Sequence, residues 1–441
     1  LTPIYPLPVE YSGCSAKEKL TRLREKLSEE KVGAILLTRL DEIAWLLNLR
    51  AGDIHCNPVF LSYAYISEKE AYLFAQSSRV PEEVRRLLEE TGVLLREYEE
   101  IFAFLPQISQ PVTLLCDEKG TNLRLMELAK ANPVLTVQLG QSPVQLMKAV
   151  KNQTELDNIY QAYILDATAQ TEFYGWLTEE MEKGVYYDEY ELSRCLQGFR
   201  KNVKEYLGDS FDAIIGYGEN GAVIHYSPQQ GTAKRLQPRG MLLNDSGGQY
   251  WQGTTDTTRT FAVGPLTNQE KRDFSLCVKG VISLTKAVFK EGTTGGQLDV
   301  LCRRHFWEHG LDYRHGTGHG VGYLLNVHEG PHGFGAGANQ VPLQEGMTVT
   351  IEPGYYEVGS HGIRIENVVH VVKDKQTEYG TFLRFETFTV MPIDTACLEP
   401  SMLTQEQRDF LNSYHRRVYE AVAPRVSPRG KKWLSEKTKG I

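Results

Sequence analysis

MLLNDSGGQYWQGTTDTTRTFAV (residues 241–263) is the stretch that decides the fold of the second half of the chain. Two apolar or β-branched runs flank a Gly-rich turn, which is the pattern of a strand, a turn and a second strand. Asp245 ends the first run and Asp256 lies within the second. The pattern therefore predicts that two carboxylates converge on one point. The alternative is that both simply cap or solvate the turn, as Asp commonly does.

Three histidines and four glycines follow in HGTGHGVGYLLNVH (residues 315–328). A Gly-rich loop lets the backbone bring imidazole rings close to a site that bulkier residues would block. His315, His319 and His328 are therefore candidates for a metal or substrate site, with a purely structural role as the alternative.

Two later segments add carboxylates. In MTVTIEPGYY (residues 347–356), an apolar strand leads Glu352 into a Pro-Gly turn, and a buried carboxylate is costly unless it is paired or metal-bound. In GIRIENVVHVV (residues 362–372), strand alternation places Arg364 and Glu366 on one face, as a salt bridge or as part of a site.

Together the four segments supply four carboxylates and at least one histidine. This oxygen-rich donor set suits Mn²⁺, Co²⁺ or Zn²⁺ better than thiophilic metals. Two such ions about 3.5–4 Å apart can hold a hydroxide between them and stabilise the oxyanion formed when it attacks an amide. The residues alone therefore indicate hydrolytic chemistry.

Composition and charge argue against several other classes. A net charge of −8 disfavours a nucleic-acid surface, because neutralising phosphates needs a basic face. No apolar run approaches the ~20 residues that span a bilayer, so a membrane protein is not expected. The seven cysteines are scattered and never form CxxC, which fits a reducing, cytoplasmic location.

The length of 441 residues predicts two domains. An amphipathic helix over residues 15–32 and a buried strand over 33–38 open an α/β domain that we expect over residues 1–141. A long charged helical pattern over residues 144–184 then crosses into the second domain, residues 142–441.

The order DSGGQY, GTTDTTRT, HGTGHGVG, NVHEGP, IEPGYYE and GIRIENVV resembles the catalytic domain of aminopeptidase P (Xaa-Pro aminopeptidase). That family belongs to the pita-bread metallopeptidases, with prolidase, methionine aminopeptidase and creatinase. LDEIAWLLNLR and NPVF extend the resemblance into the first domain. The closest resemblance is to the cytosolic three-domain type, which implies that the N-terminal domain of that type is lacking here.

The fold implied by the resemblance is an α/β plus α+β class. A creatinase/prolidase-like N-terminal α/β domain over residues 1–141 is expected to precede a pita-bread catalytic domain over residues 142–441.

The resemblance also implies two divalent metal ions, most simply Mn²⁺, with Co²⁺ or Zn²⁺ as alternatives. Asp245 would bind one metal, Asp256 and Glu366 would bridge both, and His319 and Glu352 would complete the shell.

Further catalytic residues are implied around the metals: Glu352, His225, His315, His328, Tyr356 and Arg364. The three histidines would bind the substrate or steady the tetrahedral intermediate. Tyr356 and Arg364 would line the pocket or orient Glu366. Glu352 is expected to pass a proton from the nucleophilic water to the proline nitrogen.

The implied function is hydrolysis of the bond between an N-terminal residue and a following proline in Xaa-Pro-Yaa peptides, through a di-metal-bridged hydroxide. Expected partners are such peptides and a second copy of the chain in a homodimer. Two alternatives remain: an Xaa-Pro dipeptidase (prolidase) and a non-enzymatic pita-bread binding module. FLRFETFTVMPID resembles the aminopeptidase branch, and the intact ligand set argues against a pure binder.

Overall fold

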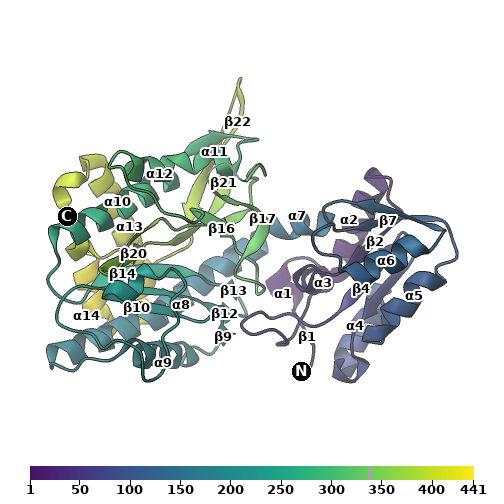
Figure 1. Cartoon of the computed structure of the whole chain (residues 1–441), viewed down its shortest axis with the longest axis horizontal. Coiled ribbons are helices and arrows are strands. Elements are labelled where there is room, and N and C mark those ends of the chain that lie inside the picture. The colour runs from purple at the N-terminus through teal and green to yellow at the C-terminus, as the bar shows by residue number, and fades with distance from the viewer. Residues whose placement is uncertain (336–338) are drawn as a thin grey trace. The chain divides into compact units, whose positions relative to one another are not determined.

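The computed structural model describes residues 1–335 and 339–441, which form two compact units (Figure 1). The first unit is Leu1–Glu155 and the second is Leu156–Ile441. Among the described residues, no helix is long and apolar enough to cross a membrane.

The first unit extends past the predicted boundary at 141/142. Helix α7 (Pro143–Ala149) packs on α2 (Ala16–Glu29) and α3 (Leu40–Leu47), so these residues belong to the N-terminal core.

The helical stretch predicted over residues 144–184 is two helices rather than one. Helix α7 ends at Ala149, and α8 (Gln153–Glu182) starts after an interruption. Val150 is extended, and the Asn152 side chain accepts a hydrogen bond from the Glu155 backbone N–H at 2.9 Å. A side-chain cap of this kind starts a new helix.

The N-terminal unit is built on a six-stranded mixed sheet in the order β6-β5-β4-β2-β7-β8. Strand β2 pairs antiparallel with β4 and parallel with β7. Its strands are β2 (Ala34–Leu37), β4 (Tyr63–Ser67), β5 (Ala71–Phe74), β6 (Leu94–Arg96), β7 (Val112–Cys116) and β8 (Leu135–Leu139).

Helices α5 (Ile101–Gln107) and α6 (Leu123–Ala131) cover one face of this sheet. Leu36 and Phe74 of the sheet pack in one buried cluster with Leu105 of α5. The unit also contains β1 (Tyr5–Pro6), α1 (Val9–Ser12), β3 (Leu49–Arg50), α4 (Glu82–Thr91) and two 3₁₀ helices, η1 (Ser77–Arg79) and η2 (Tyr98–Glu100).

The C-terminal unit contains a six-stranded sheet, in the order β15-β22-β21-β18-β16-β17, and three smaller ones, β10-β11-β14, β13-β12-β9 and β19-β20. The strands are β9 (Tyr206–Asp209), β10 (Ile214–Tyr217), β11 (Met241–Ser246), β12 (Gly248–Tyr250), β13 (Gly253–Thr254), β14 (Thr257–Ala262), β15 (Val288–Lys290), β16 (Gly318–Gly320), β17 (Glu329–Phe334), β18 (Thr348–Ile351), β19 (Gly354–Glu357), β20 (His361–Arg364), β21 (Asn367–Thr377) and β22 (Gly380–Thr387).

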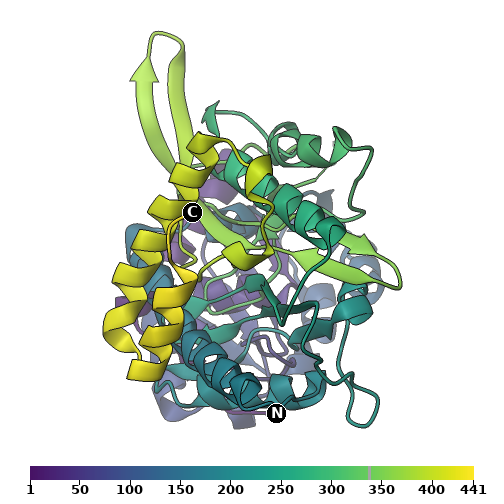
Figure 2. The ribbon, with the colours of Figure 1, turned by 90° about the vertical axis from the view of Figure 1, so that its left-hand side faces the viewer.

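In the part of the chain that the structure describes, these sheets are accompanied by α8, α9 (Glu189–Lys201), α10 (Asn268–Thr285), α11 (Gly295–Leu298), α12 (Val300–Trp307), α13 (Gln405–Val422) and α14 (Pro428–Lys437). Figure 2 shows α13 and α14 side by side on the outside of the unit, and the hairpin of β21 and β22 projecting from it. The 241–263 stretch forms the two predicted strands, β11 and β14, which pair antiparallel, and the predicted turn between them contains two further short strands, β12 and β13.

Two glycines allow strands that carry candidate residues to approach other backbone closely. A Cβ added to Gly362, in β20, would lie 1.8 Å from the Gly221 carbonyl oxygen. One added to Gly318, in β16, would lie 1.8 Å from the carbonyl oxygen of Thr350. Neither position has room for any other residue.

Candidate active site

A hollow of about 700 Å³ in the C-terminal unit gathers most of the predicted site residues. Eight of the ten line it: Asp245, Asp256, His319, Glu352, Arg364, His225, His315 and His328. Of the other two, Tyr356 is hydrogen-bonded to His315 and Arg364 of the lining, and a Glu366 oxygen lies within 4.8 Å of ligand atoms of Asp256 and His319. Residues that lie far apart in the sequence are thus brought to one place.

Short strands deliver the acidic side chains. Asp245 lies in β11 directly opposite Thr258 of β14, and Asp256 immediately precedes β14. Glu366 connects to the same strand, since its backbone N–H donates to the Thr258 carbonyl at 3.0 Å. Glu352 follows β18, and its backbone N–H donates to the Thr317 carbonyl at 2.7 Å.

The carboxylates are crowded and buried. Ligand atoms of Asp256, His319 and Glu366 all lie within 4.8 Å of one another. Burial, and then repulsion from neighbouring carboxylates, raises the pKa of Asp256 and of Glu366 well above the ordinary range. Burial also raises the pKa of Glu352. A site that makes ionisation this unfavourable needs added positive charge before all its acids can be charged at neutral pH.

Two oxygens of the cluster show where such charge fits. Among the described residues, Asp245 Oδ1 and Glu366 Oε1 are buried without a hydrogen-bond donor. Buried carboxylate oxygens are normally paired or bound to a cation. Together with the imidazole, this oxygen-rich set fits hard to borderline divalent metal ions.

The ring of His319 is oriented so that a lone pair faces the acids. Its Nδ1 lies 2.7 Å from the Gly320 carbonyl, which can only accept, so Nδ1 carries the proton. In the neutral ring, Nε2 is then unprotonated, and it lies 3.4 Å from Asp256 Oδ2 and 3.3 Å from Glu352 Oε1. A backbone carbonyl that fixes the tautomer in this way is typical of metal-binding histidines.

Two threonines that the sequence reading missed support the acids from behind. The Thr258 hydroxyl donates to Glu366 Oε2 at 2.8 Å, and the Thr350 hydroxyl donates to Glu352 Oε1 at 3.1 Å. Strand alternation could have found the first, because Asp256 and Thr258 in GTTDTTRT are two residues apart and share a face. The same alternation could have found Thr350, because it lies two residues before Glu352.

We expect Thr258→Val to lower activity by about 10- to 100-fold, the usual loss when a residue supporting a metal ligand is removed. Valine keeps the shape of the side chain but leaves Glu366 Oε2 without its donor. Kinetics and metal titration on the purified variant measure the effect. Thr257→Val, one residue earlier on the opposite face of the strand, is the matched control. Equal activity of both variants would contradict a supporting role for Thr258.

Arg364 pairs with a different acid from the one expected. Its Nη2 and Nε donate to Asp245 Oδ2 at 2.7 and 3.1 Å, whereas Glu366 takes its bond from Thr258. The chain breaks its strand pattern between β20 and β21, so Arg364 and Glu366 do not lie along one continuous strand. Arg364 therefore orients Asp245, rather than Glu366.

His315, Tyr356 and Arg364 form a hydrogen-bonded chain. His315 Nδ1 donates to the Gly316 carbonyl at 2.8 Å, so its Nε2, 2.8 Å from the Tyr356 oxygen, accepts the hydroxyl proton. Burial lowers the pKa of His315 to about 4, which keeps this ring neutral. Arg364 Nη1 in turn donates to the Tyr356 oxygen at 3.0 Å. Both ring nitrogens of His315 are thus engaged.

His328 and His225 lie elsewhere on the wall of the hollow. The rings of His328 and His319 have centroids 4.1 Å apart. Burial, followed by the nearby His319, lowers the pKa of His328 to about 4. His328 is therefore a neutral imidazole at physiological pH. His225 is exposed at the edge of the same hollow.

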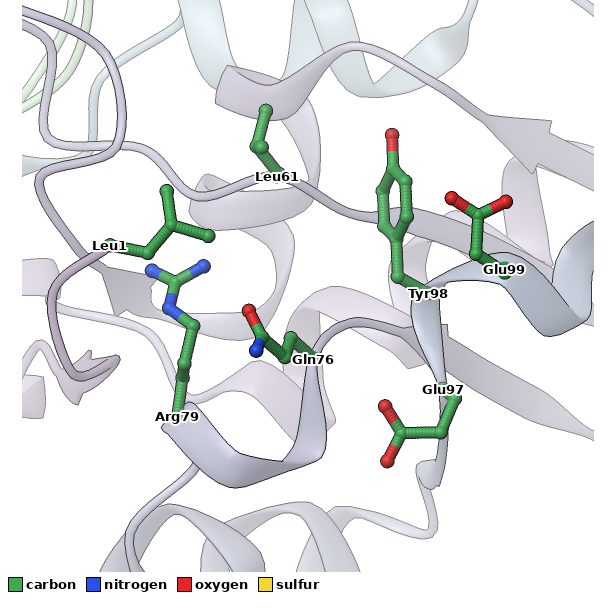
Figure 3. A pocket seen from close by; sticks show the side chains of 7 residues that line it. All are labelled: Leu1, Leu61, Gln76, Arg79, Glu97, Tyr98 and Glu99. Carbon is green, nitrogen blue, oxygen red and sulfur yellow. The ribbon is translucent and has the colours of Figure 1, made fainter.

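A smaller hollow of about 290 Å³ lies in the N-terminal unit (Figure 3). Its one cationic side chain among the labelled residues, Arg79, is already occupied, since it donates to Asp53 Oδ2 at 2.7 Å and to the Thr2 carbonyl at 2.9 Å. None of the predicted site residues lines it.

Comparison with known families divides the chain in the same way as the structure. The profile of the Creatinase/Prolidase N-terminal domain matches residues 1–155. That of metallopeptidase family M24 matches residues 157–373, and that of the C-terminal region of peptidase M24 matches residues 381–441.

Curated relatives match almost the whole chain. The probable Xaa-Pro aminopeptidase P of Laccaria bicolor is 41% identical, over 98% of this chain and 68% of its own length. The probable Xaa-Pro aminopeptidase P of Sordaria macrospora is 40% identical, over 96% of this chain and 71% of its own length.

Solved structures agree. The X-prolyl aminopeptidase of Caenorhabditis elegans, described as a cytosolic enzyme with a di-nuclear active site, superposes with a TM-score of 0.94 at 34% identity, covering 100% of this chain and 73% of that one. An Xaa-Pro dipeptidase from Bacillus anthracis has a TM-score of 0.65 at 24% identity, covering 86% of this chain and 99% of that one, which shows the shared fold.

These matches confirm the predicted fold class, a creatinase/prolidase N-terminal domain followed by a pita-bread domain. The expectation that an N-terminal domain is lacking is not supported, because a creatinase N-terminal domain is present over residues 1–155.

Proposed function

Because the chain belongs to the Xaa-Pro aminopeptidase P branch of metallopeptidase family M24, we propose that it removes the N-terminal residue from peptides whose second residue is proline. One observation of the structure carries this proposal. Asp245, Asp256 and Glu352 line an open hollow together with His319, and Glu366 lies directly beside Asp256 and His319. The names of the relatives support the preference for proline.

Two divalent metal ions, most simply Mn²⁺, are proposed to bind Asp245, Asp256, His319, Glu352 and Glu366. When bound, the ions would polarise the scissile carbonyl and make a water acidic enough to attack it near neutral pH. The raised carboxyl pKa values and the two unpartnered buried oxygens support this ligand set. The di-nuclear site of the C. elegans enzyme supports the number of ions.

Glu352 is the group best placed to move the proton. It lines the hollow, and its Oε1 lies beside His319 while accepting from Thr350. A carboxylate beside the attacking water can take its proton and pass it on to the leaving group. We therefore assign Glu352 the transfer of the water proton to the departing proline nitrogen.

The neutral histidines have separate roles. His328 lines the hollow as a neutral ring and can donate one N–H to the oxyanion that develops on the carbonyl. His225 is proposed to act beside it. His315 has no donor left for substrate, so its assigned role is to hold Tyr356, which Arg364 also orients.

A bond that precedes proline suits this arrangement. The proline nitrogen is a tertiary amide without an N–H, so recognition cannot depend on that donor. The hollow instead offers apolar side chains, Phe211, Ile214, Ile224 and Val327, beside its polar floor. These can contact the proline ring without asking for a hydrogen bond.

We expect the purified protein, reconstituted with Mn²⁺, to release the first residue from an Xaa-Pro-Yaa tripeptide, and to lose this activity in a chelator. Reconstitution with Co²⁺ and Zn²⁺ in parallel identifies the preferred metal. Chromatographic detection of the released residue and of the Pro-Yaa product measures the reaction. Xaa-Ala-Yaa, matched in length, is the control substrate and should react far more slowly.

Other outcomes point to the two alternatives. Hydrolysis restricted to Xaa-Pro dipeptides would indicate a prolidase. A protein that holds neither ion, and that no added ion activates, would indicate a binding module.

We also propose a cytoplasmic homodimer. The cytosolic description of the C. elegans enzyme supports the location. Light scattering on the purified protein tests the dimer, and a monomeric mass would contradict it.

A further inference from the structure

The segment that carries His225 and Tyr226 has little regular structure of its own. It leaves β10 at Tyr217, forms the short 3₁₀ helix η3 (Gly218–Ala222), and then runs without helix or strand to residue 234. His225 and Tyr226 line the catalytic hollow from this segment. Because the hydrogen bonds of a sheet do not hold it, the direction of both side chains depends on another anchor.

One carboxylate supplies that anchor. Glu189, the first residue of α9, is fully buried at 0% exposure. The backbone N–H groups at both ends of the segment donate to it, Tyr217 to Oε1 at 2.7 Å and Lys234 to Oε2 at 2.8 Å.

Two side chains within the segment donate to the same group. The Tyr226 hydroxyl reaches Glu189 Oε2 at 2.7 Å, and Asn220 Nδ2 lies 3.0 Å from Oε1 and 3.1 Å from Oε2. Asn220 Nδ2 also lies 3.1 Å from the Tyr226 oxygen. The segment is therefore tied at its start, its end and two interior points to one acid.

The charge of this acid has its own support. Glu189 lies in the first turn of a thirteen-residue helix, where the helix dipole favours a negative group. Three of its hydrogen bonds, from Tyr217, Tyr226 and Lys234, are 2.7–2.8 Å long, and hydrogen bonds to a charged acceptor are stronger than neutral ones. Burial, followed by the hydrogen bond to Glu189 and its negative charge, raises the pKa of Tyr226, so that hydroxyl stays a donor.

We propose that Glu189 is a positioning residue of the reaction: it holds His225 and Tyr226 against the substrate without touching the substrate itself. It lies behind Tyr226 and is not among the residues that line the hollow. This inference rests on the proposed peptidase function. Glutamine at this position would place an amide NH₂ against groups that are themselves donors, and would release part of the segment.

We expect Glu189→Gln to lower kcat for an Xaa-Pro-Yaa peptide by about 10- to 100-fold, the loss that small misplacements of catalytic groups produce. Metal content should stay unchanged. Amide hydrogen exchange over residues 217–234 should become faster, since Tyr217 and Lys234 lose their acceptor. Glu191→Gln, two residues along the same helix and part of its capping box, is the matched control and should leave kcat unchanged.

A double-mutant cycle separates positioning from general destabilisation. If Glu189 acts through His225, then Glu189→Gln should cost little further activity in a His225→Ala background. Asn220→Ala, which removes one donor from the segment and leaves Glu189 charged, repeats the test if Glu189→Gln folds poorly.

The outcomes distinguish this inference from the proposed function. A wild-type protein that does not cleave Xaa-Pro-Yaa peptides would overturn the function, and with it the role of Glu189. An active wild-type protein would overturn the role of Glu189 alone under either of two results. One is the same fold-loss in both backgrounds, and the other is unchanged exchange over residues 217–234.

Discussion

Replacing Glu352 by Gln is expected to lower kcat for an Xaa-Pro-Yaa peptide by about 10³-fold, within the range that a general acid–base group contributes. The glutamine would keep the size of the side chain and an oxygen that can bind a cation. It could not accept the water proton and return it to the proline nitrogen. Kinetics with a tripeptide substrate measure the loss.

Metal content decides how such a loss is interpreted, because Glu352 is also a proposed ligand. Elemental analysis of the variant should find the same two ions as in the wild type. Glu357→Gln, an acid of the β19–β20 hairpin whose carboxylate accepts from the Tyr355 hydroxyl, is the control and should remain active. A Glu352→Gln enzyme that held both ions and kept most of its activity would refute the proton-transfer role.

Replacing Asp256 by Asn should have two opposite effects, on activity and on stability. Activity should fall by more than about 100-fold, beyond the usual loss for residues that merely support ligands. In the metal-free protein, the same change should increase stability. It removes a group that the folded protein must either protonate or bury as a charge repelled by Asp245 and Glu352, the largest causes of its raised pKa after burial itself.

The pH dependence follows from the direction of these shifts. The pKa values of Asp256 and Glu366 are raised in the folded protein and return to about 4 on unfolding. Above that value these two groups hold more protons in the folded protein than in the unfolded chain, so their contribution to stability is largest at low pH and falls as pH rises. Metal-free Asp256→Asn should show a shallower fall.

Thermal unfolding in a chelator between about pH 5 and 8 measures both slopes. Asp374→Asn, which changes an acid of the β21–β22 hairpin, is the control and should follow the wild type. Parallel slopes for wild type and Asp256→Asn would show that the carboxylates do not repel one another as described. Added Mn²⁺ should flatten the wild-type slope.

The sequence predicted the parts of the site that depend on local pattern. The strand-turn-strand pattern of residues 241–263 predicted that Asp245 and Asp256 converge, and in the structure β11 pairs with β14 and both side chains line the hollow. The glycines around His319 allow the close backbone approach that was inferred, since Gly318 lies against Thr350. Each expectation rested on the residue types within one short segment of the chain.

Partners across the fold could not be predicted in the same way. Alternation shows which face Arg364 occupies but not that Asp245, from another strand, lies there to receive it. Tyr163, whose oxygen accepts from the Asp256 backbone N–H at 3.2 Å, comes from a helix far earlier in the chain. Glu189 carries no local signal beyond that of a helix start.

The candidate ligands lie in or beside five strands, β11, β14, β16, β18 and β21. This spacing along the chain affects how the protein folds. No short fragment can assemble the site, because only Asp245 with Asp256 and Glu352 with Glu366 are close in sequence, and the other pairs depend on distant strand pairing, which forms slowly. Metal uptake should therefore come at the end of refolding. Ions that bind only the folded site stabilise the folded protein by mass action. Bound metal would therefore stabilise the native topology after the strands have paired.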